Sequence, residues 1–378
     1  MTRLEQLAVV RGPTLVLMAT GVYWGALAGM MPDIKVAVGA SDGLMGALLM
    51  VPASASVLAM WAAPWLGEKV GGTILPISGL MIAAGLLLYL MVGSVPTLAV
   101  AIFLGGFAVA FSDMTANVRI AAYEARRDVH LMNFAHAAYS LSFAITAIIV
   151  AVLRTGGWDF RSISVVLAAI ALVYVLIGWD ARDPGGAQDE SRAGRRPPRV
   201  VVLLAGLVLF ASFVVENASE AWTALHIERT FGALQGTGSF GPATFGFVMF
   251  AGRLFGQALA RRLGAERLIL SSASLAVIGA FVIALAVNVG QVHAGVVLMA
   301  MGVAVIVPST NSIIARKVSD AARPRAISRA WMLGLLGFFA GPALMGLFAE
   351  FGSLRVSFAA IGVISALIIP AIIALGRR

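Results

Sequence analysis

The chain has 378 residues, of which 60% are hydrophobic and only 12% are charged, and its mean hydropathy is +0.95. A soluble domain carries roughly 25% charged residues, so this composition excludes an ordinary water-soluble fold and predicts a polytopic membrane protein. The formal net charge of +9 would favour nucleic-acid binding in a soluble chain, but here the basic residues stand in short segments beside apolar runs, where they set membrane topology.

The first half of the chain contains apolar runs whose lengths match one or two membrane crossings of about 20 residues each. The run at residues 70–112 is long enough for two crossings, and Gly93-Ser94-Val95-Pro96 within it predicts the turn between the third and fourth spans. We place the other four spans at residues 12–32, 43–67, 131–153 and 162–179. A polar segment at 180–199 follows, without apolar periodicity, and predicts a solvated linker.

The same order of spans recurs after the linker. The long run at 268–315 includes Asn288-Val289-Gly290-Gln291 and is again divided into a third and a fourth span. The remaining spans are placed at residues 200–225, 240–260, 330–349 and 356–376. This repeated order predicts an all-α membrane protein with twelve transmembrane helices in two six-helix bundles, residues 1–179 and 200–378, although the halves share little residue identity.

The distribution of Lys and Arg predicts the orientation of the chain. If the N-terminus lies inside, the opposite face keeps few basic residues, namely Lys35, Arg154, Arg161, Arg229 and Arg355. Cytoplasmic loops are enriched in Lys and Arg, so both termini and the linker are predicted to be cytoplasmic. The short loops and the Arg-rich cytoplasmic face fit a multi-pass protein of a bacterial inner membrane, and we expect a monomer.

The stretch from residue 105 to 142 departs most clearly from a simple apolar pattern. Read as two helices joined by a turn, it places Asp113, Asn117 and Glu124 on one face, because steps of four and seven residues return to nearly the same angle. The second helix carries a similar stripe, formed by Asn133, His136 and Ser140. Ionisable groups are costly in lipid, so these side chains are expected to face protein or water.

Twelve spans arranged as six plus six around a cytoplasmic linker resemble the major facilitator superfamily of secondary transporters over the whole chain. The segment with Asp113, Asn117, Met132, Phe134 and His136 is similar to the fucose-permease-like branch, although here the His stands one residue later than in that branch. A second match is the run E-N-A-S-E-A-W at 216–222. The loop motif of the superfamily is recognisable at 256–267 but has decayed at 67–72, which lacks the acid-Arg pair. The resemblance implies alternating access, with two halves that rock about a midplane site.

Asp113 is the residue that we predict to couple transport to protons. It stands within span four without an adjacent basic residue, and burial favours the protonated form of a carboxylate. The alternative is a structural ion pair, for which the candidate partners are Lys35, Arg119 and Arg253.

Three further titratable side chains are predicted to take part in proton coupling, namely Glu216, Glu220 and His136. Glu216 and Glu220 lie one helical turn apart, and two like charges in a low dielectric should not both ionise. Glu220 could instead lie in a solvated outer vestibule near Trp222 and His226. His136 could also be a neutral side chain that bonds a neighbouring helix.

Polar and aromatic side chains in the spans are candidates for solute binding. The predicted ligands are Trp24, Asn117, Asn133, Ser140, Asn217, Trp222 and Asn311. The alternatives are that polar side chains hold helices together and that aromatic side chains only pack.

Charged residues near the turn after span four are predicted to form a gating or charge network. The candidates are Glu124, Arg126 and Arg127, together with Arg253 in span eight. A solvated loop is the alternative for the first three. Arg253 could neutralise an anionic solute or join Arg261 and Arg262 in a cytoplasmic charge network.

Other functional classes find little support in the sequence. Motifs for nucleophilic hydrolases, zinc peptidases and phosphate-binding loops are absent, as is Cys, so we expect no enzyme activity, metal or cofactor. The sequence predicts proton-coupled import of a small polar, sugar-like solute. Proton-driven efflux of an amphipathic compound is the alternative, favoured by Met- and Phe-rich spans. A non-transporting sensor is the third possibility. The short linker without a soluble domain argues against it.

Overall fold

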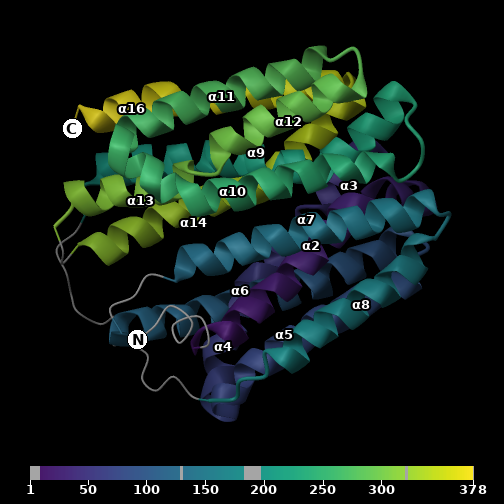
Figure 1. The fold of residues 1–378 in the computed structure, drawn as a ribbon, viewed down its shortest axis with the longest axis horizontal. Helices are drawn as coiled ribbons and strands as arrows, with labels where there is room; N and C mark the ends of the chain where they lie inside the picture. Colours follow the sequence, from purple (N-terminus) through teal and green to yellow (C-terminus); the bar gives the residue numbers. More distant parts are fainter. Residues whose placement is uncertain (1–8, 128–130, 183–196, 320–321, 378) are drawn as a thin grey trace.

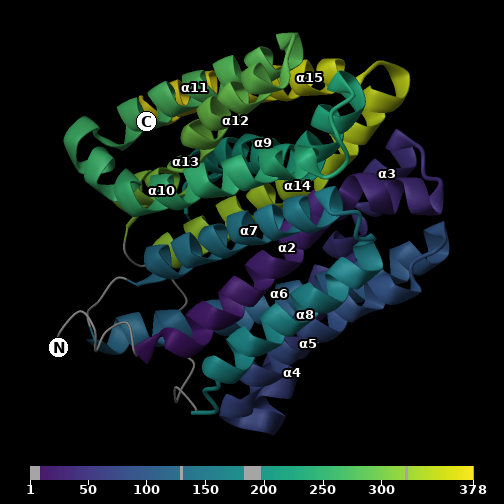
Figure 2. The ribbon, with the colours of Figure 1, turned by 45° about the vertical axis from the view of Figure 1, so that its right-hand side comes forward.

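The computed structural model describes residues 9–127, 131–182, 197–319 and 322–377. These residues form helices and short connections, without a β-strand among them. The helices lie in two bundles side by side, the first drawn in purple to teal and the second in green to yellow (Figure 1). The start of α2 and the end of α16 lie at the same end of the molecule, called here the terminal end (Figures 1 and 2).

Each bundle is built from consecutive helices. The first contains α2 (Arg11–Val38), α3 (Asp42–Leu48), α4 (Val51–Val70), η1 (Gly71–Thr73), α5 (Ile74–Leu87), η2 (Leu88–Met91), α6 (Val95–Arg127), α7 (Met132–Thr155) and α8 (Phe160–Ile177). The second contains α9 (Arg199–Phe231), η3 (Thr237–Ser239), α10 (Phe240–Leu263), α11 (Ala265–Leu285), α12 (Val289–Val303), α13 (Ile306–Lys317), α14 (Arg323–Phe351), α15 (Leu354–Ala366) and α16 (Ile368–Gly376).

The helices account for twelve membrane crossings. Ten stretches of the described chain are long and apolar enough to span a bilayer, and the stretch Asp42–Met91, with 50 residues, is long enough for two crossings. The 24-residue helix α10, which contains several Arg residues, supplies the twelfth. The predicted twelve-helix fold is therefore confirmed.

Several helices are longer than the apolar runs that predicted them. The apolar run of span four ends at residue 112, but α6 continues to Arg127 and so carries Asp113, Asn117 and Glu124 on one helix, as their spacing predicts. Helix α9 likewise continues past residue 225 to Phe231. In both cases the added turns carry charged and polar side chains. Such residues lower the apolar signal without interrupting the backbone hydrogen bonds, so hydropathy alone places the helix end too early.

Three predicted spans are interrupted, and proline explains each interruption. Proline lacks an N–H and cannot bond the carbonyl four residues earlier. Pro52 therefore leaves the carbonyl of residue 48, where α3 ends, without its helical hydrogen bond. Pro308 does the same to the carbonyl of residue 304, just after α12. Pro370 does the same at residue 366, where α15 ends. The spans composed of α3/α4, α12/α13 and α15/α16 are consequently broken helices.

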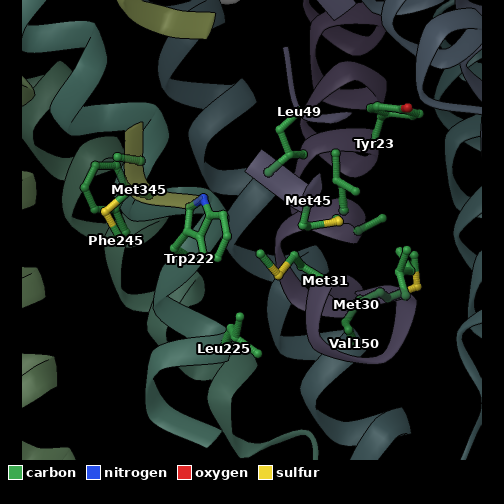
Figure 3. Packing of buried hydrophobic residues seen from close by; sticks show 14 of the residues in the cluster. Tyr23, Met30, Met31, Met45, Leu49, Val150, Trp222, Leu225, Phe245 and Met345 are labelled. Carbon is green, nitrogen blue, oxygen red and sulfur yellow. The ribbon is translucent and has the colours of Figure 1, made fainter. Parts of the chain in front are cut away.

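The bundles meet chiefly along three helix pairs, α7 with α10, α3 with α14 and α2 with α9. Small residues allow the close approach: a Cβ on Gly246 of α10 would lie 2.7 Å from Phe143, and one on Gly346 of α14 would lie 2.5 Å from the carbonyl oxygen of Asp42. Buried apolar side chains from both bundles fill the space between these pairs. Figure 3 shows methionines of α2, α3 and α14 beside Trp222 and Leu225 of α9.

Candidate functional site

A polar network in the middle of the helices is centred on Arg253 of α10. Its Nη2 atom lies 2.8 Å from Oε1 of Glu216 on α9, and Glu216 is buried. Its Nη1 atom donates to Oγ of Ser140 and, at 3.4 Å, to the carbonyl oxygen of His136, both on α7. Arg253 stands ten residues before the end of α10, about 15 Å along the helix. The network therefore joins the two bundles deep within the membrane region.

This arrangement corrects one sequence-based alternative. Arg261 and Arg262 stand at the exposed end of α10, eight or more residues away, so Arg253 does not belong to their charge network. Its partners are instead a buried carboxylate in its own bundle and polar groups of the other bundle.

Asp113 of α6 lies apart from the basic side chains of the described chain. Its Oδ2 atom accepts a 3.0 Å hydrogen bond from Nδ2 of Asn117, one turn later, and the residue is half-buried. The three cations proposed as partners, Lys35, Arg119 and Arg253, each pair with another carboxylate. The Oδ1 atom of Asn117 is buried without a hydrogen-bond partner among the described residues. Asp113 is thus a carboxylate whose described contact is a neutral amide.

A small cavity lies between the bundles, close to the Arg253 network. Its walls come from α2, α9 and α14 and from the break after α3, and they comprise Trp24, Leu27, Ala28, Leu49, Asn217, Glu220, Ala221, Phe338 and Phe339. Its volume of about 20 Å³ holds little more than one water-sized group. Glu220 is half-buried and has no hydrogen-bond or ion-pair partner in the described part of the chain. It faces an interior cavity lined by aromatic rings, which differs from the solvated vestibule considered as an alternative.

Two of the predicted solute ligands hold helices together in this structure. Trp222, which is labelled in Figure 3, is fully buried. Its Nε1 atom donates a 3.1 Å hydrogen bond to the carbonyl oxygen of Pro342, so it ties α9 to α14. Asn311 of α13 accepts a 3.0 Å bond from Nε1 of Trp331 on α14. Neither side chain lines the cavity. Asn133 lies half-buried in the first turn of α7, nearer the terminal end.

The predicted charge network after span four is mainly a helix cap. Oε1 of Glu124 accepts hydrogen bonds from the backbone N–H groups of Leu131, at 2.5 Å, and Met132, at 2.8 Å. These N–H groups begin α7 and have no partner within the helix, so Glu124 satisfies them. Arg126 is exposed near the end of α6. The side chain of Arg127 lies outside the described residues.

Sequence reasoning missed a buried ion cluster at the end of the bundles away from the termini. Arg154, in the last turn of α7, has a fully buried side chain. It contacts both carboxylate oxygens of Asp33 on α2 at 2.6 Å and those of Glu228 on α9 at 2.7 and 3.0 Å. It also donates to the carbonyl oxygen of Gly29 and to Oγ of Ser239, each at 3.0 Å. We call these five residues the Arg154 cluster.

The Arg154 cluster and a neighbouring pair join the two bundles at the far end. Asp42, at the start of α3, lies 3.1 Å from Lys35 of its own bundle and 2.7 Å from Arg229 of the second bundle. Toward the terminal end, the ion pairs among described residues stay within one bundle, as do Arg119–Asp180 and Arg316–Glu266. Charge interactions therefore hold the bundles together at the far end and in the middle.

The sequence contained a weak signal for this cluster. Few charged residues stand on the far side, and the five basic ones there are Lys35, Arg154, Arg161, Arg229 and Arg355. A basic residue at the end of an apolar span needs a counter-charge when it is buried, and acidic residues follow two other spans at positions 33 and 228. A count of the charged residues on that side could have suggested that Arg154, Asp33 and Glu228 lie near one another, but it could not have specified their contacts.

Comparisons with known proteins agree with the fold. The family model described as "Major Facilitator Superfamily" matches residues 14–301 and 221–378. An uncharacterized MFS-type transporter of Yersinia pestis is 24% identical over 373 residues, covering 96% of each chain. The membrane protein MosC of Rhizobium meliloti is 25% identical over 331 residues, or 87% of this chain and 81% of that protein.

Solved structures are similar over nearly the whole chain. A bacterial homologue of the human lysosomal transporter Spinster, in an inward-facing and occupied conformation, has a TM-score of 0.76 at 16% identity, covering 100% of this chain and 98% of that one. The nucleoside transporter NupG has a TM-score of 0.70 at 14% identity, covering 98% and 99%. Identities this low establish the fold and leave the solute open.

Proposed function

The chain belongs to the Major Facilitator Superfamily and is a membrane transporter, not an enzyme, and from that premise we propose that it imports a small polar solute together with protons by alternating access. The observation that carries the proposal is the placement of the polar groups. Arg253, Glu216, Asp113 and Glu220 lie about halfway along their helices, on both sides of the boundary between the bundles. A site shared by two rocking halves can be exposed to either side of the membrane in turn.

The arrangement of the ion pairs supports an inward-facing state. The bundles are joined at the far end by the Arg154 cluster and by the pair of Asp42 with Arg229. The Lys and Arg distribution favours a cytoplasmic terminal end. In that orientation the outer side is closed. We place the protein in the inner membrane of a bacterium as a monomer, in keeping with its bacterial relatives.

Asp113 is the proposed site of the coupling proton. Its described contact is the neutral amide of Asn117, so no basic side chain of the described chain balances its charge. A carboxylate in an apolar span is more stable when protonated, and its charge is a barrier to moving the helix through a low-dielectric environment. Proton binding from outside and release inside would then drive uptake.

Arg253 is the proposed link between the solute site and the movement of the halves. It holds Glu216 within the second bundle and reaches Ser140 and His136 of the first. Rocking of the bundles must separate Arg253 from α7 while its pair with Glu216 moves as one unit. A polar solute that bonds Ser140 would compensate for one of the lost hydrogen bonds. Trp24 and Asn217 on the cavity wall are the other proposed solute contacts.

Uptake into proteoliposomes tests the proposal. The purified protein is reconstituted, an inward proton gradient is imposed, and accumulation of radiolabelled sugars, polyols, nucleosides and amines is measured. We expect gradient-driven accumulation of at least one solute, which Asp113→Asn abolishes while solute exchange without a gradient persists. Glu68→Gln, an exposed carboxylate at the end of α4, is the control and should behave like the parent. Accumulation that survives collapse of the gradient would contradict proton coupling.

One observation favours the alternative of efflux. Most of the cavity wall is apolar or aromatic, with Leu27, Leu49, Phe338 and Phe339 beside the polar Glu220. Such a wall suits an amphipathic compound. In the same vesicles, efflux would appear as loss of a preloaded amphipathic compound driven by the opposite proton gradient, without accumulation of hydrophilic solutes.

A further inference from the structure

The charges in the middle of the molecule do not balance. Three carboxylates, Asp113, Glu216 and Glu220, lie there with the single guanidinium group of Arg253 among the described residues. Arg253 forms an ion pair with Glu216 at 2.8 Å and acts on Glu220 only through a longer-range attraction. With Asp113 assigned to the proton, Glu220 is left as a carboxylate that needs a positive counter-charge whenever it is ionised.

The side chains around Glu220 indicate what kind of cation could bind beside it. The cavity beside it is walled by the rings of Trp24, Phe338 and Phe339, and Trp24 meets Phe338 edge to face at 5.8 Å between ring centres. Aromatic faces attract organic cations, with about 0.5–2 kcal/mol for each such contact. A small metal ion would need several oxygen ligands, and no group of three metal-binding side chains occurs in the described chain. The walls therefore fit an organic ammonium group.

The size of the cavity fits the same group. About 20 Å³ accommodates one water-sized group, which is the size of a protonated amino head and too small for a whole solute. The amide of Asn217, one turn before Ala221 on α9, lies on the same wall and can accept a second N–H bond. An ammonium head could thus be held by a carboxylate, an amide oxygen and the aromatic rings of Trp24 and Phe338.

We propose that this cavity binds the protonated amine of the transported solute, with Glu220 as its counter-ion and Trp24 and Phe338 as its aromatic walls. The inference rests on the proposed transport function and specifies its solute class: a small hydroxylated or amphipathic molecule with a primary or secondary amine. The remainder of the solute lies outside the cavity, toward the Arg253 network. Neutral sugars and anions lack the group that Glu220 requires.

Matched pairs of compounds test the amine directly. Purified protein is heated with ethylammonium or ethanol, glucosamine or glucose, and tyramine or 4-(2-hydroxyethyl)phenol, and the unfolding temperature is followed against concentration. We expect at least one amine to raise the unfolding temperature, with an affinity at least tenfold above that of its neutral analogue. Equal affinities within a pair, or no shift from any of the three amines, would overturn the inference.

Variants then assign the binding to the cavity. Glu220→Gln should weaken amine binding at least tenfold and bring the preference over the neutral analogue below about threefold, whereas Glu68→Gln should leave both unchanged. Trp24→Leu should weaken amine binding, and Trp24→Phe should restore most of it, because a ring face is regained. The unfolding temperature without ligand reports whether each variant is folded. An amine preference that persists in folded Glu220→Gln would refute the role of Glu220.

Transport measurements separate this inference from the proposed function. If a neutral solute accumulates in an Asp113-dependent way and Glu220→Gln leaves its uptake intact, the transporter proposal stands and the amine inference fails. If an amine binds with the expected dependence on Glu220 but no solute crosses a sealed bilayer, the cavity assignment stands and the transport proposal fails.

Discussion

Removal of the Arg154 side chain should open the far end of the molecule. Arg154 is the cation that holds Asp33 of the first bundle and Glu228 of the second within 2.6–2.7 Å of one guanidinium group. In Arg154→Gln, the two carboxylates are left facing each other without a positive charge. They can separate into water only if the bundles part at this end. The substitution therefore raises the free energy of the joined state relative to the opened one.

The magnitude follows from the burial of the cluster. Loss of one partner from a buried ion pair costs about 3–5 kcal/mol, because a charge is left uncompensated. The side chains of Asp33 and Glu228 are 15% and 12% exposed, so water relieves part of the repulsion and the lower end of this range applies. About 3 kcal/mol, at about 1.4 kcal/mol for each factor of ten, changes the ratio of joined to opened molecules roughly 100-fold.

The opening of the far end can be measured by thiol labelling, because the chain contains no Cys and a single introduced Cys is then its one thiol. A single Ala28→Cys substitution places a thiol on the cavity wall, where the parent side chain is 4% exposed, beside Gly29 of the Arg154 cluster. A membrane-impermeant maleimide added to intact cells should label this thiol much faster in Arg154→Gln than in the parent, by a factor approaching 100. A labelling rate within twofold of the parent would refute the reasoning.

Two controls isolate the cause. Arg161, also at the far end, bonds the carbonyl oxygen of Val92 within its own bundle, so Arg161→Gln should leave the labelling rate unchanged. Adding Asp33→Asn and Glu228→Gln to Arg154→Gln removes the orphaned charges, and the labelling rate should fall back toward that of the parent.

Three further outcomes follow from the contacts of buried side chains. Trp222→Ala should lower the stability of the second bundle by about 3–5 kcal/mol, because a large cavity opens and the bond to Pro342 is lost, and thermal unfolding should show Trp222→Phe to be milder. Glu124→Ala should cost about 1 kcal/mol by removing the cap of α7, and Glu124→Gln, which keeps an acceptor, should cost less in the same measurement. Burial alone would raise the pKa of Asp180, but hydrogen bonds from the side chain and backbone of Arg182 hold that pKa below its ordinary value. The folded state is therefore stabilised above about pH 4 and loses this contribution as the pH falls further, so Asp180→Asn should flatten the decline of unfolding temperature on acidification.

Most of the helical architecture was predictable because its causes are local. Apolar runs of membrane length specify the spans, and turn residues such as Gly93 and Asn288 divide the long runs where the structure divides them. The breaks at Pro52, Pro308 and Pro370 follow from the missing N–H of each proline. The apolar runs stop before the helix ends at Arg127 and Phe231, because hydropathy depends on the side chains whereas a helix depends on its backbone hydrogen bonds.

The contacts of the site were much less accessible from the sequence. Arg253 and Glu216 are 37 positions apart on different helices, and Arg154 lies 121 positions from Asp33. Helical periodicity gives the face on which a side chain stands but not the rotation of one helix against another. The sequence could therefore select Asp113, Glu216 and Glu220 as costly groups in a membrane, but only packing shows which of them has a basic partner.

The distribution of partners suggests how coupling would arise. Asp113 belongs to the first bundle and Glu220 to the second, and each lacks a basic partner in the described chain, whereas Glu216 is neutralised by Arg253. In the proposed cycle, two uncompensated charges oppose the movement of the halves until a proton binds Asp113 and an ammonium group binds Glu220. Either ligand alone leaves one buried charge, so the barrier falls fully only when both are present. Proton and solute would then move together because the two bundles must be neutralised separately.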